Sequence, residues 1–317
     1  MQLLRSLSGY VKDPKGLSLA IGNFDGVHLG HQAVIRRMQE KARALGLKSA
    51  VMLFEPHPRE FFCKDHPPAR LSSLEDKCFL LEKLGVEQVL CMGFDEAFAS
   101  QSPGEFVKDL LVSKLGVREV TVGSLFNFAK GGCGDIKLMQ EIGAPLGLCC
   151  EAIAGVTLDG VRISSTLIRE LLKKGDVQGA QRALGHPFSI GGIVEHGKAL
   201  GRSLGFPTAN LSLKRQVCPV SGVFAVKVQT PCGLYGGMCN AGLRPTAESS
   251  RKEPLLEASL FHFTGSLYGK GIRVYFIEKI REERRFPDLR QLTLQLRQDQ
   301  DRALGILKDH PGDEGII

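Results

Sequence analysis

A glycine-rich segment with two histidines, GNFDGVHLGH over residues 22–31, joins two regular elements near the start of the chain. The apolar run 17–21 before it predicts a buried strand. Apolar residues recur with largely helical spacing over 32–45, and Gly46 marks the expected end of that helix. A strand that turns into a helix is the building unit of an α/β sheet, so the segment predicts this fold for the first part of the chain.

The link between this strand and helix has the chemistry of a phosphate site. Backbone N–H groups at a helix N-terminus are unpaired, and the helix dipole favours negative charge there. Glycines let a phosphate approach the backbone, and the imidazoles of His28 and His31 add hydrogen-bond donors. The spacing differs from the dinucleotide-binding fingerprint and matches the H-x-G-H motif of adenylyl-transferring α/β proteins. A metal pair, which lacks a nearby third ligand, and a plain surface turn are the alternatives.

The chain divides into two regions of different texture. Up to residue 184, apolar strand-like runs alternate with helical segments, which implies a parallel sheet covered on both faces. After Gly185, short strands and Gly/Pro turns dominate and predict a small antiparallel barrel or sandwich, closed by a helix over 288–307. The 317 residues are enough for two cores, so we predict domains at 1–184 and 185–317.

Composition argues against a membrane-spanning or disulfide-stapled chain. Hydrophobic residues make up 43% of the sequence, but no apolar run is long enough to cross a bilayer, and residues 1–10 lack a signal-peptide core. The nine cysteines form no C-x-x-C pair, which favours reduced thiols and a cytoplasmic location. The net charge of +7 suits small anionic ligands, and positive residues gather only over 279–285, so neither nucleic acid nor a membrane is an expected partner.

Two further motifs lie in the first region. His57 and Pro58 follow the second predicted strand at its carboxyl end, where ligands bind in open α/β sheets; the alternative is a proline-stiffened turn with a surface histidine. Residues 162–169 begin a helix with hydroxyl side chains at its N-terminus, which alone is an ordinary cap. With Arg169 one turn into the helix, the same segment also makes a phosphate cradle.

The second region carries a longer signature. Residues 197–211 read GKALGRSLGFPTANL, with glycines and basic residues before a Pro-Thr-Ala-Asn sequence. The later parts of the signature are residues 222–225, 240–246, Glu257 and 267–269.

Taken in order over about residues 21–304, these motifs resemble those of bacterial bifunctional riboflavin kinase/FAD synthetases. The resemblance implies an FMN adenylyltransferase domain of nucleotidyltransferase-like fold with a Rossmann-like parallel sheet. It also implies a riboflavin kinase domain, a six-stranded Greek-key barrel with a C-terminal helix. The expected chemistry is phosphorylation of riboflavin to FMN, then adenylylation of FMN to FAD with release of pyrophosphate. ATP and the three flavins are the expected ligands, with Mg²⁺ accompanying ATP, and self-association is left open.

Carried over to the first domain, the resemblance places His28 and His31 at the ATP phosphates as catalytic residues that stabilise charge on the α-phosphate and the leaving pyrophosphate. The other positions it implies for ATP are Gly22, Asn23, Phe24, Asp25, Gly30, Ser164, Ser165 and Arg169. The positions it implies for the flavin are His57, Pro58 and Phe128.

In the kinase domain, Glu257 matches the catalytic base that takes the proton from the 5′-hydroxyl of riboflavin; the alternative is an ordinary strand-edge carboxylate. Thr208 and Asn210 offer hard oxygen ligands for Mg²⁺ that bridges ATP phosphates. The positions implied for ATP are Gly197, Gly201, Arg202, Thr208 and Asn210. Arg281 is expected at the flavin.

One motif of the first domain, over residues 122–135, departs from the family pattern. Leu125 replaces a polar residue, Ala129 replaces a glycine and Gly132 replaces an arginine. Leu125 cannot hydrogen-bond a ligand and Gly132 carries no charge, and each lost hydrogen bond typically costs about 1 to 3 kcal/mol. We therefore expect weakened binding of FMN.

The bifunctional enzyme is the leading hypothesis. The alternative is a riboflavin kinase whose N-terminal domain is catalytically weakened and acts as a flavin- or nucleotide-binding module. Leu125 and Gly132 favour that alternative, and the intact histidine pair argues against it. A non-enzymatic flavin sensor would need Glu257 or Thr208 to be idle, and no residue of the sequence indicates this.

Overall fold

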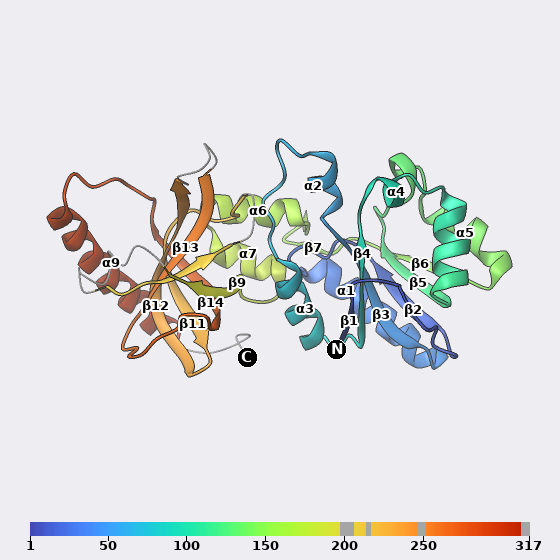
Figure 1. Cartoon of the computed structure of the whole chain (residues 1–317), viewed down its shortest axis with the longest axis horizontal. Coiled ribbons are helices and arrows are strands. Elements are labelled where there is room, and N and C mark those ends of the chain that lie inside the picture. Colours follow the sequence, from blue (N-terminus) through green and yellow to red (C-terminus); the bar gives the residue numbers. More distant parts are fainter. Residues whose placement is uncertain (197–205, 214–216, 246–251, 312–317) are drawn as a thin grey trace. The chain divides into compact units, whose positions relative to one another are not determined.

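A computed structural model describes residues 1–196, 206–213, 217–245 and 252–311 (Figure 1). The chain forms two compact units. The first comprises Met1–Pro68 and Leu74–Ser164, and the second comprises Ala69–Ser73 and Ser165–Ile317. The second unit therefore includes the helices α6 (Ser165–Lys174) and α7 (Val177–Leu184), which precede the predicted boundary at residue 185. The predicted boundary at residue 185 separates the two predicted domains, 1–184 and 185–317, and it stays a prediction.

The first unit is built on a six-stranded sheet in which every strand pair is parallel, with the order β1-β4-β3-β2-β5-β6. The strands are β1 (Gln2–Leu4), β2 (Leu17–Ile21), β3 (Lys48–Glu55), β4 (Gln88–Gly93), β5 (Val117–Gly123) and β6 (Cys149–Ile153). All five residues of β2 are buried, which explains its continuous apolar run. The strand order reverses at β2, which is flanked by β3 and β5, and such a switch point is where open α/β sheets bind ligands.

Helical segments cover both faces of this sheet. The helical segments of this unit are α1 (Leu29–Leu45), α2 (Pro58–Phe62), α3 (Leu74–Lys83), α4 (Glu96–Ala99), the π-helical η1 (Glu105–Lys114), η2 (Lys130–Gly132), α5 (Ile136–Gly143) and η3 (Ala144–Leu146). Side chains of α1 and α3 share one core cluster with Ala20 of β2, whereas η1 and α5 share another with Leu19. Because neighbouring residues of a strand point to opposite faces, the two clusters lie on opposite sides of the sheet. This confirms the predicted α/β domain.

Helix α1 begins three residues before the predicted start at Gln32. The reason is its N-cap: Nδ1 of His28 accepts a hydrogen bond from the backbone N–H of His31 at 3.2 Å. Histidine is not among the usual N-cap residues, so the pattern did not indicate this start. The end of the helix is as predicted, with Gly46 in the left-handed region.

The second unit contains a closed antiparallel barrel with the strand order β10-β13-β12-β11-β14-β9. Its strands are β9 (Ser189–Glu195), β10 (Ala209–Ser212), β11 (Gly222–Thr230), β12 (Gly233–Pro245), β13 (Lys252–Leu260) and β14 (Gly271–Arg281). Ala303 of the C-terminal helix α9 (Leu289–Asp309) shares a core cluster with Val223 and Met238 of the barrel. The predicted Greek-key barrel with a terminal helix is confirmed.

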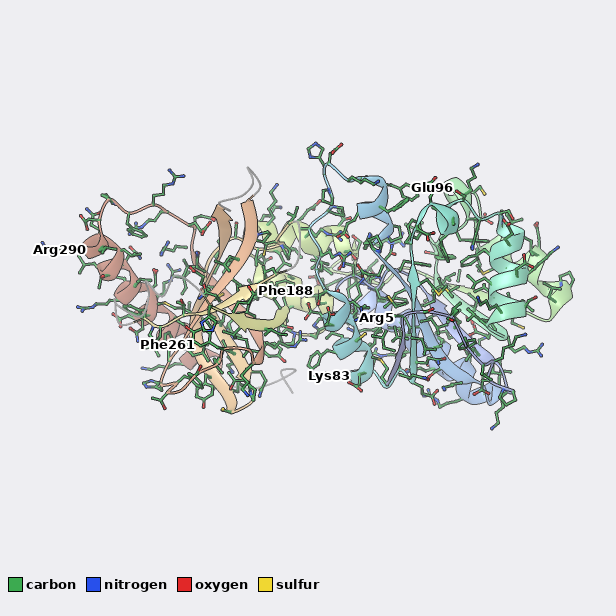
Figure 2. The ribbon with its side chains drawn as sticks, in the orientation of Figure 1. Arg5, Lys83, Glu96, Phe188, Phe261 and Arg290 are labelled. Atoms are coloured by element: carbon green, nitrogen blue, oxygen red, sulfur yellow. The ribbon has the colours of Figure 1, made fainter. Side chains whose placement is uncertain are left out.

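The side chains follow the usual separation of apolar and charged groups (Figure 2). Phe188 and Phe261 are buried in the second unit, whereas charged side chains such as Glu96 and Arg290 are exposed. All nine cysteines are free thiols, in agreement with the prediction of no disulfide framework. Within the described ranges, no helix is both long and apolar enough to cross a membrane.

Candidate active sites

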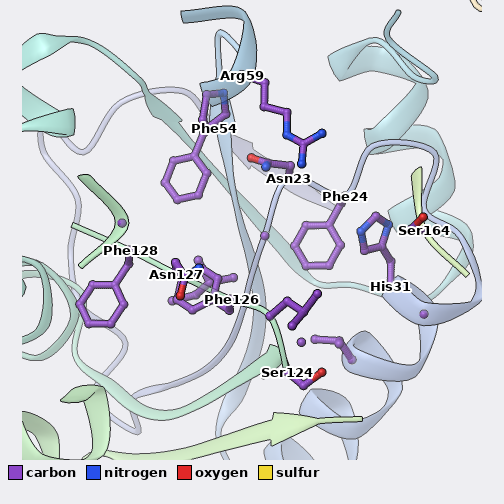
Figure 3. Close-up of a pocket in the computed structure, with 18 of the residues that line it drawn as sticks. Asn23, Phe24, His31, Phe54, Arg59, Ser124, Phe126, Asn127, Phe128 and Ser164 are labelled. Carbon is purple, nitrogen blue, oxygen red and sulfur yellow. The ribbon is translucent and has the colours of Figure 1, made fainter. Parts of the chain in front are cut away.

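A cavity of about 780 Å³ opens at the carboxyl ends of the central strands of the first unit (Figure 3). Its lining includes Gly22 and Asn23, which follow β2, and Ser124 and Leu125, which follow β5. The cavity therefore lies at the switch point of the sheet, where the loops after β2 and β5 diverge. A short ribbon of β7 (Thr157–Leu158) and β8 (Val161–Arg162) leads to the last lining residue, Ser164.

One part of this cavity is aromatic. Besides Phe24, seven phenylalanines from several segments line it: Phe54, Phe62, Phe94, Phe98, Phe106, Phe126 and Phe128. Their rings contact one another, with centroid separations of 5.5 Å for Phe54–Phe98 and 5.1 Å for Phe106–Phe128. Phe62 is 64% exposed at the edge of the cavity. Such a wall fits the face of a large planar ring.

Another part of the cavity holds the two imidazoles. The rings of His28 and His31 are stacked, with centroids 3.6 Å apart and an angle of 15° between their planes. Phe24 supports His31 from the side at 5.3 Å, and its backbone lies in the left-handed region with φ of 47°. A phenylalanine rarely adopts this conformation, and strain of this kind tends to gather at functional sites.

Two buried polar atoms in this part of the cavity, one of them in an imidazole ring, have no hydrogen-bond partner in the described residues. Nδ1 of His31 and Oδ1 of Asn23 are buried, and neither has a hydrogen bond within the described part of the chain. Burial lowers the pKa of His31 well below its usual range, and the nearby His28 and Lys77 lower it further, so the ring is neutral at physiological pH. Buried polar atoms are normally hydrogen-bonded, so these two are suited to a bound ligand.

The charge of the cavity has one sign. Arg59 and Arg162 line it, and among its lining residues in the described ranges there is no aspartate or glutamate. Neither arginine is among the residues predicted for the site. Arg59 directly follows Pro58, and Arg162 opens the segment singled out as a phosphate cradle, so their places in the two motifs were the available signal. The cavity is therefore suited to anionic ligands.

The structure brings most of the residues predicted for the first site together. The predicted residues that line the cavity are Gly22, Asn23, Phe24, His28, Gly30, His31, Pro58, Phe128 and Ser164. Asp25 and His57 are buried and do not line it; Nδ1 of His57 instead accepts the backbone N–H of Arg59 and caps α2. Ser165 and Arg169 belong to the second unit, where Nε of Arg169 donates to the backbone oxygen of Ala69 at 2.6 Å. Their role at ATP stays a prediction.

The three residues that depart from the family pattern also line the cavity. The side chain of Leu125 is 71% exposed, so it faces the open space and does not pack into the loop. Ala129 has a φ of 64°, a conformation that glycine adopts without cost and alanine does not. The expected weakening of FMN binding stays a prediction.

In the barrel, the register of the strands brings four polar residues into one row. Asn210 of β10 lies opposite Glu195 of β9 and Glu257 of β13, and Glu257 lies opposite Asn240 of β12. Directly opposed residues of antiparallel strands lie on the same face, with Cβ atoms about 4.5 to 5.5 Å apart. The predicted base and one predicted metal ligand are thus neighbours on one surface of the barrel.

A smaller cavity of about 90 Å³ adjoins this row. Thr208 and Asn210 line it together with Phe263 and Tyr268. Nδ2 of Asn210 points to the backbone oxygen of Thr208 at 3.4 Å, which leaves its Oδ1 to face elsewhere. The other predicted nucleotide contacts of this domain, Gly197, Gly201 and Arg202, lie outside the described residues.

Arg281, the residue predicted to contact flavin in the kinase domain, has a structural partner. Its Nε and Nη2 atoms donate to the carboxylate of Asp299 in α9 at 2.7 to 3.0 Å, and Asp299 is almost completely buried. This ion pair fastens α9 to β14. A flavin contact by Arg281 stays a prediction, and the guanidinium would have to make it with its remaining N–H groups.

Comparison with known proteins places both units in one family. The family model described as FAD synthetase matches residues 11–167, and the one described as riboflavin kinase matches residues 184–307. A bifunctional riboflavin kinase/FMN adenylyltransferase from Haemophilus influenzae is 43% identical over 304 residues, which cover 96% of this chain and 98% of that relative. The protein of the same name from Pseudomonas fluorescens is 43% identical over 299 residues, covering 94% of this chain and 96% of the relative.

A solved structure has the same fold over nearly the whole length. It is the crystal structure of a protein described as a macrolide-efflux protein from Streptococcus pneumoniae, with a TM-score of 0.78 and 27% identity, covering 94% of this chain and 97% of that one. The two domain matches, the full-length relatives and the two candidate sites agree. The chain belongs to the family of bifunctional riboflavin kinases/FMN adenylyltransferases.

Proposed function

We propose that this chain phosphorylates riboflavin to FMN in its barrel and adenylylates FMN to FAD in its first unit, with ATP as the second substrate of both reactions. The lining of the larger cavity carries the proposal for FAD formation. It combines an aromatic wall, two unpaired polar atoms and two arginines, without a carboxylate among its described lining residues. A flavin ring fits the wall, and phosphates fit the remainder.

In adenylyl transfer, an oxygen of the FMN phosphate attacks the α-phosphorus of ATP, and the bond to the bridging oxygen of pyrophosphate breaks. Negative charge develops on the transferring and leaving phosphates, so fixed N–H donors lower the barrier. Nδ1 of His28 is occupied as an acceptor, which puts its ring proton on Nε2 as a donor. Burial holds the pKa of His31 well below its usual range, and its own Nδ1 is unpaired, so the two rings can follow the charge without a proton transfer.

In the kinase reaction, Glu257 would accept the proton of the 5′-hydroxyl of riboflavin as that oxygen attacks the γ-phosphorus of ATP. Its place opposite Asn210 supports this role, because it puts the base beside the residues expected at the nucleotide. The hydroxyl of Thr208 and the amide oxygen of Asn210 are the hard ligands that Mg²⁺ prefers, and both residues line the same cavity. We therefore propose Mg²⁺ there, where it would neutralise charge on the ATP phosphates.

Nine free thiols fit a reducing compartment, so we propose that the enzyme works in the cytoplasm. Flavins and ATP are its proposed ligands, and we expect neither nucleic acid nor a membrane to bind it. The alternative of a kinase with a weakened first domain gains no support from the relatives, which are named for both activities.

Chromatography of the products from riboflavin, ATP and Mg²⁺ tests the proposal. Both FMN and FAD should appear. FMN alone would reduce the first unit to a binding module, and the absence of both products would refute the proposed function. His31→Ala and Glu257→Gln are the matched controls: the first should still make FMN from riboflavin, and the second should still make FAD from added FMN.

A further inference from the structure

The guanidinium of Arg59 places a positive charge at the larger cavity from an anchored backbone. It follows Pro58 in the short helix α2, whose backbone is fixed by two hydrogen bonds of Arg59 itself: its N–H donates to Nδ1 of His57 at 3.0 Å, and its oxygen accepts from Cys63 at 2.9 Å. Figure 3 shows the side chain extending from this helix toward Asn23, between Phe54 and His31 in that view. The backbone is thus anchored while the guanidinium reaches the cavity.

The guanidinium has no partner of its own in the described residues, since no ion pair or side-chain hydrogen bond involves it. The side chain of Asn23, which lines the same cavity, has a buried oxygen that is also without a hydrogen bond. No carboxylate lines the cavity in the described part of the chain to neutralise the charge. A guanidinium offers paired N–H donors that match a phosphate, and here they remain available.

Two phosphate-bearing substrates meet in this cavity, and position distinguishes them. The N-terminus of α1 and the stacked imidazoles form one anion-binding site, which suits the phosphates of ATP. Arg59 comes instead from the helix that supplies Pro58 and Phe62 to the apolar part of the cavity. A substrate that lays a flavin ring on that part and carries one terminal phosphate would bring this phosphate to Arg59.

We propose that Arg59 binds the 5′-phosphate of FMN and makes the adenylyltransferase site discriminate FMN from riboflavin; this inference rests on the proposed function. The position where the family pattern has an arginine is Gly132, so the motif over 122–135 contributes no guanidinium to the cavity. Arg59 offsets the repulsion between the FMN phosphate and the ATP phosphates as they approach. It takes up and releases no proton, because the attacking phosphate oxygen is already ionised.

The test compares FAD formation from FMN and ATP in the parent, Arg59→Ala and Arg59→Lys. Arg59→Ala should raise the KM for FMN about tenfold, less than a buried charged contact would give because Arg59 is exposed. Arg59→Lys should fall between, since it keeps the charge and loses the paired donors. The KM for ATP and the rate of FMN formation from riboflavin should not change. Lys64→Ala removes an exposed cation of the same segment that does not line the cavity, and it should behave as the parent.

Inhibition by 5′-deoxyriboflavin, which has neither the phosphate nor the hydroxyl to be phosphorylated, separates a phosphate contact from a general change of the pocket. Its inhibition constant against FMN should be the same in the parent and in Arg59→Ala. An unchanged KM for FMN, or equal weakening of FMN and the analogue, would overturn the inference. A parent that makes no FAD would refute the proposed function instead, and equilibrium binding of FMN against the analogue would then still test Arg59.

Discussion

The substitution Gly30→Ala should reduce adenylyl transfer while leaving the stability of the fold almost unchanged. Gly30 lies between the two histidines in the first turn of α1, in ordinary helical backbone. A Cβ atom there would lie 3.1 Å from Cε1 and 3.2 Å from Nδ1 of the His28 ring. These distances are shorter than ordinary van der Waals contact, so the ring must move by a few tenths of an ångström. The same Nδ1 is the cap of the helix, so the movement also strains its hydrogen bond to His31.

The effects on stability nearly cancel. Alanine favours a helix over glycine by about 0.8 to 1.0 kcal/mol, and a weakened N-cap costs about 0.5 to 2 kcal/mol. The net change is thus at most about 1 kcal/mol, or a shift in Tm of about 2 to 4 °C for a domain of this size. Catalysis has no such compensation. A misplacement of about 1 Å can cost about 100-fold in rate, and the new methyl group also stands where a phosphate would approach the backbone. We expect FAD formation from FMN to fall about 10- to 100-fold.

The assay follows FAD from FMN and FMN from riboflavin in the same preparation, with Tm measured alongside. Gly104→Ala is the matched control, because Gly104 also has helical backbone and a Cβ there would meet only Oγ of Ser102, at 4.0 Å. FAD formation within about twofold of the parent, far less than the expected loss, would show that the His28 ring does not need its present place. Loss of both activities, or a large drop in Tm, would show that the reasoning on stability is wrong.

Three further predictions follow from other parts of the chain. Glu257→Gln should lower FMN formation about 10²- to 10⁴-fold while ATP binding, measured by calorimetry, is kept; a smaller loss would exclude Glu257 as the base. A thiol reagent at mildly alkaline pH should label the exposed Cys63 quickly and leave Cys91 unlabelled in the folded protein, because burial raises the pKa of the Cys91 thiol to about 11. Burial also raises the pKa of Glu119, so the folded state holds that proton more tightly than the unfolded state, and stability falls as pH rises above the ordinary carboxyl range. The urea midpoint of Glu119→Gln relative to the parent should therefore increase between about pH 5 and pH 8, and a constant difference would contradict this.

Much of the fold could be predicted because local signals and burial agree. The apolar run of β2 is buried on both faces, so its pattern needed no knowledge of its neighbours. One strand of the six-stranded sheet and one of the barrel were not predicted, β1 with three residues and β10 with four. Strands this short have no clear periodicity, and their pairing with β4, or with β9 and β13, is what forms them. Helix α1 began early for a similar reason, since its cap is a histidine side chain.

The residues of the first site were predictable where they adjoin a motif. His28 and His31 lie in one segment of ten residues, and their spacing alone places them on one turn of a helix. The aromatic wall was not predictable in the same way. Phe54, Phe94 and Phe106 are far apart in the sequence, and in the sequence each looks like an ordinary core residue. The parallel order of β3 and β4 and the packing of η1 on the sheet bring them to one edge of it.

The departures over residues 122–135 show how a motif and a site differ. A motif assigns a charge to a position. The family pattern has an arginine where this chain has Gly132, so by the motif alone the first domain lacks one cation. A site needs the charge only within reach of the ligand, and the cavity that contains Gly132 is also lined by Arg59 and Arg162 from other segments. Since an anionic ligand responds to the summed field of its surroundings, cations on other segments can replace the lost one. The exposed Leu125 then adds apolar surface beside the aromatic wall, where a hydrogen bond was expected.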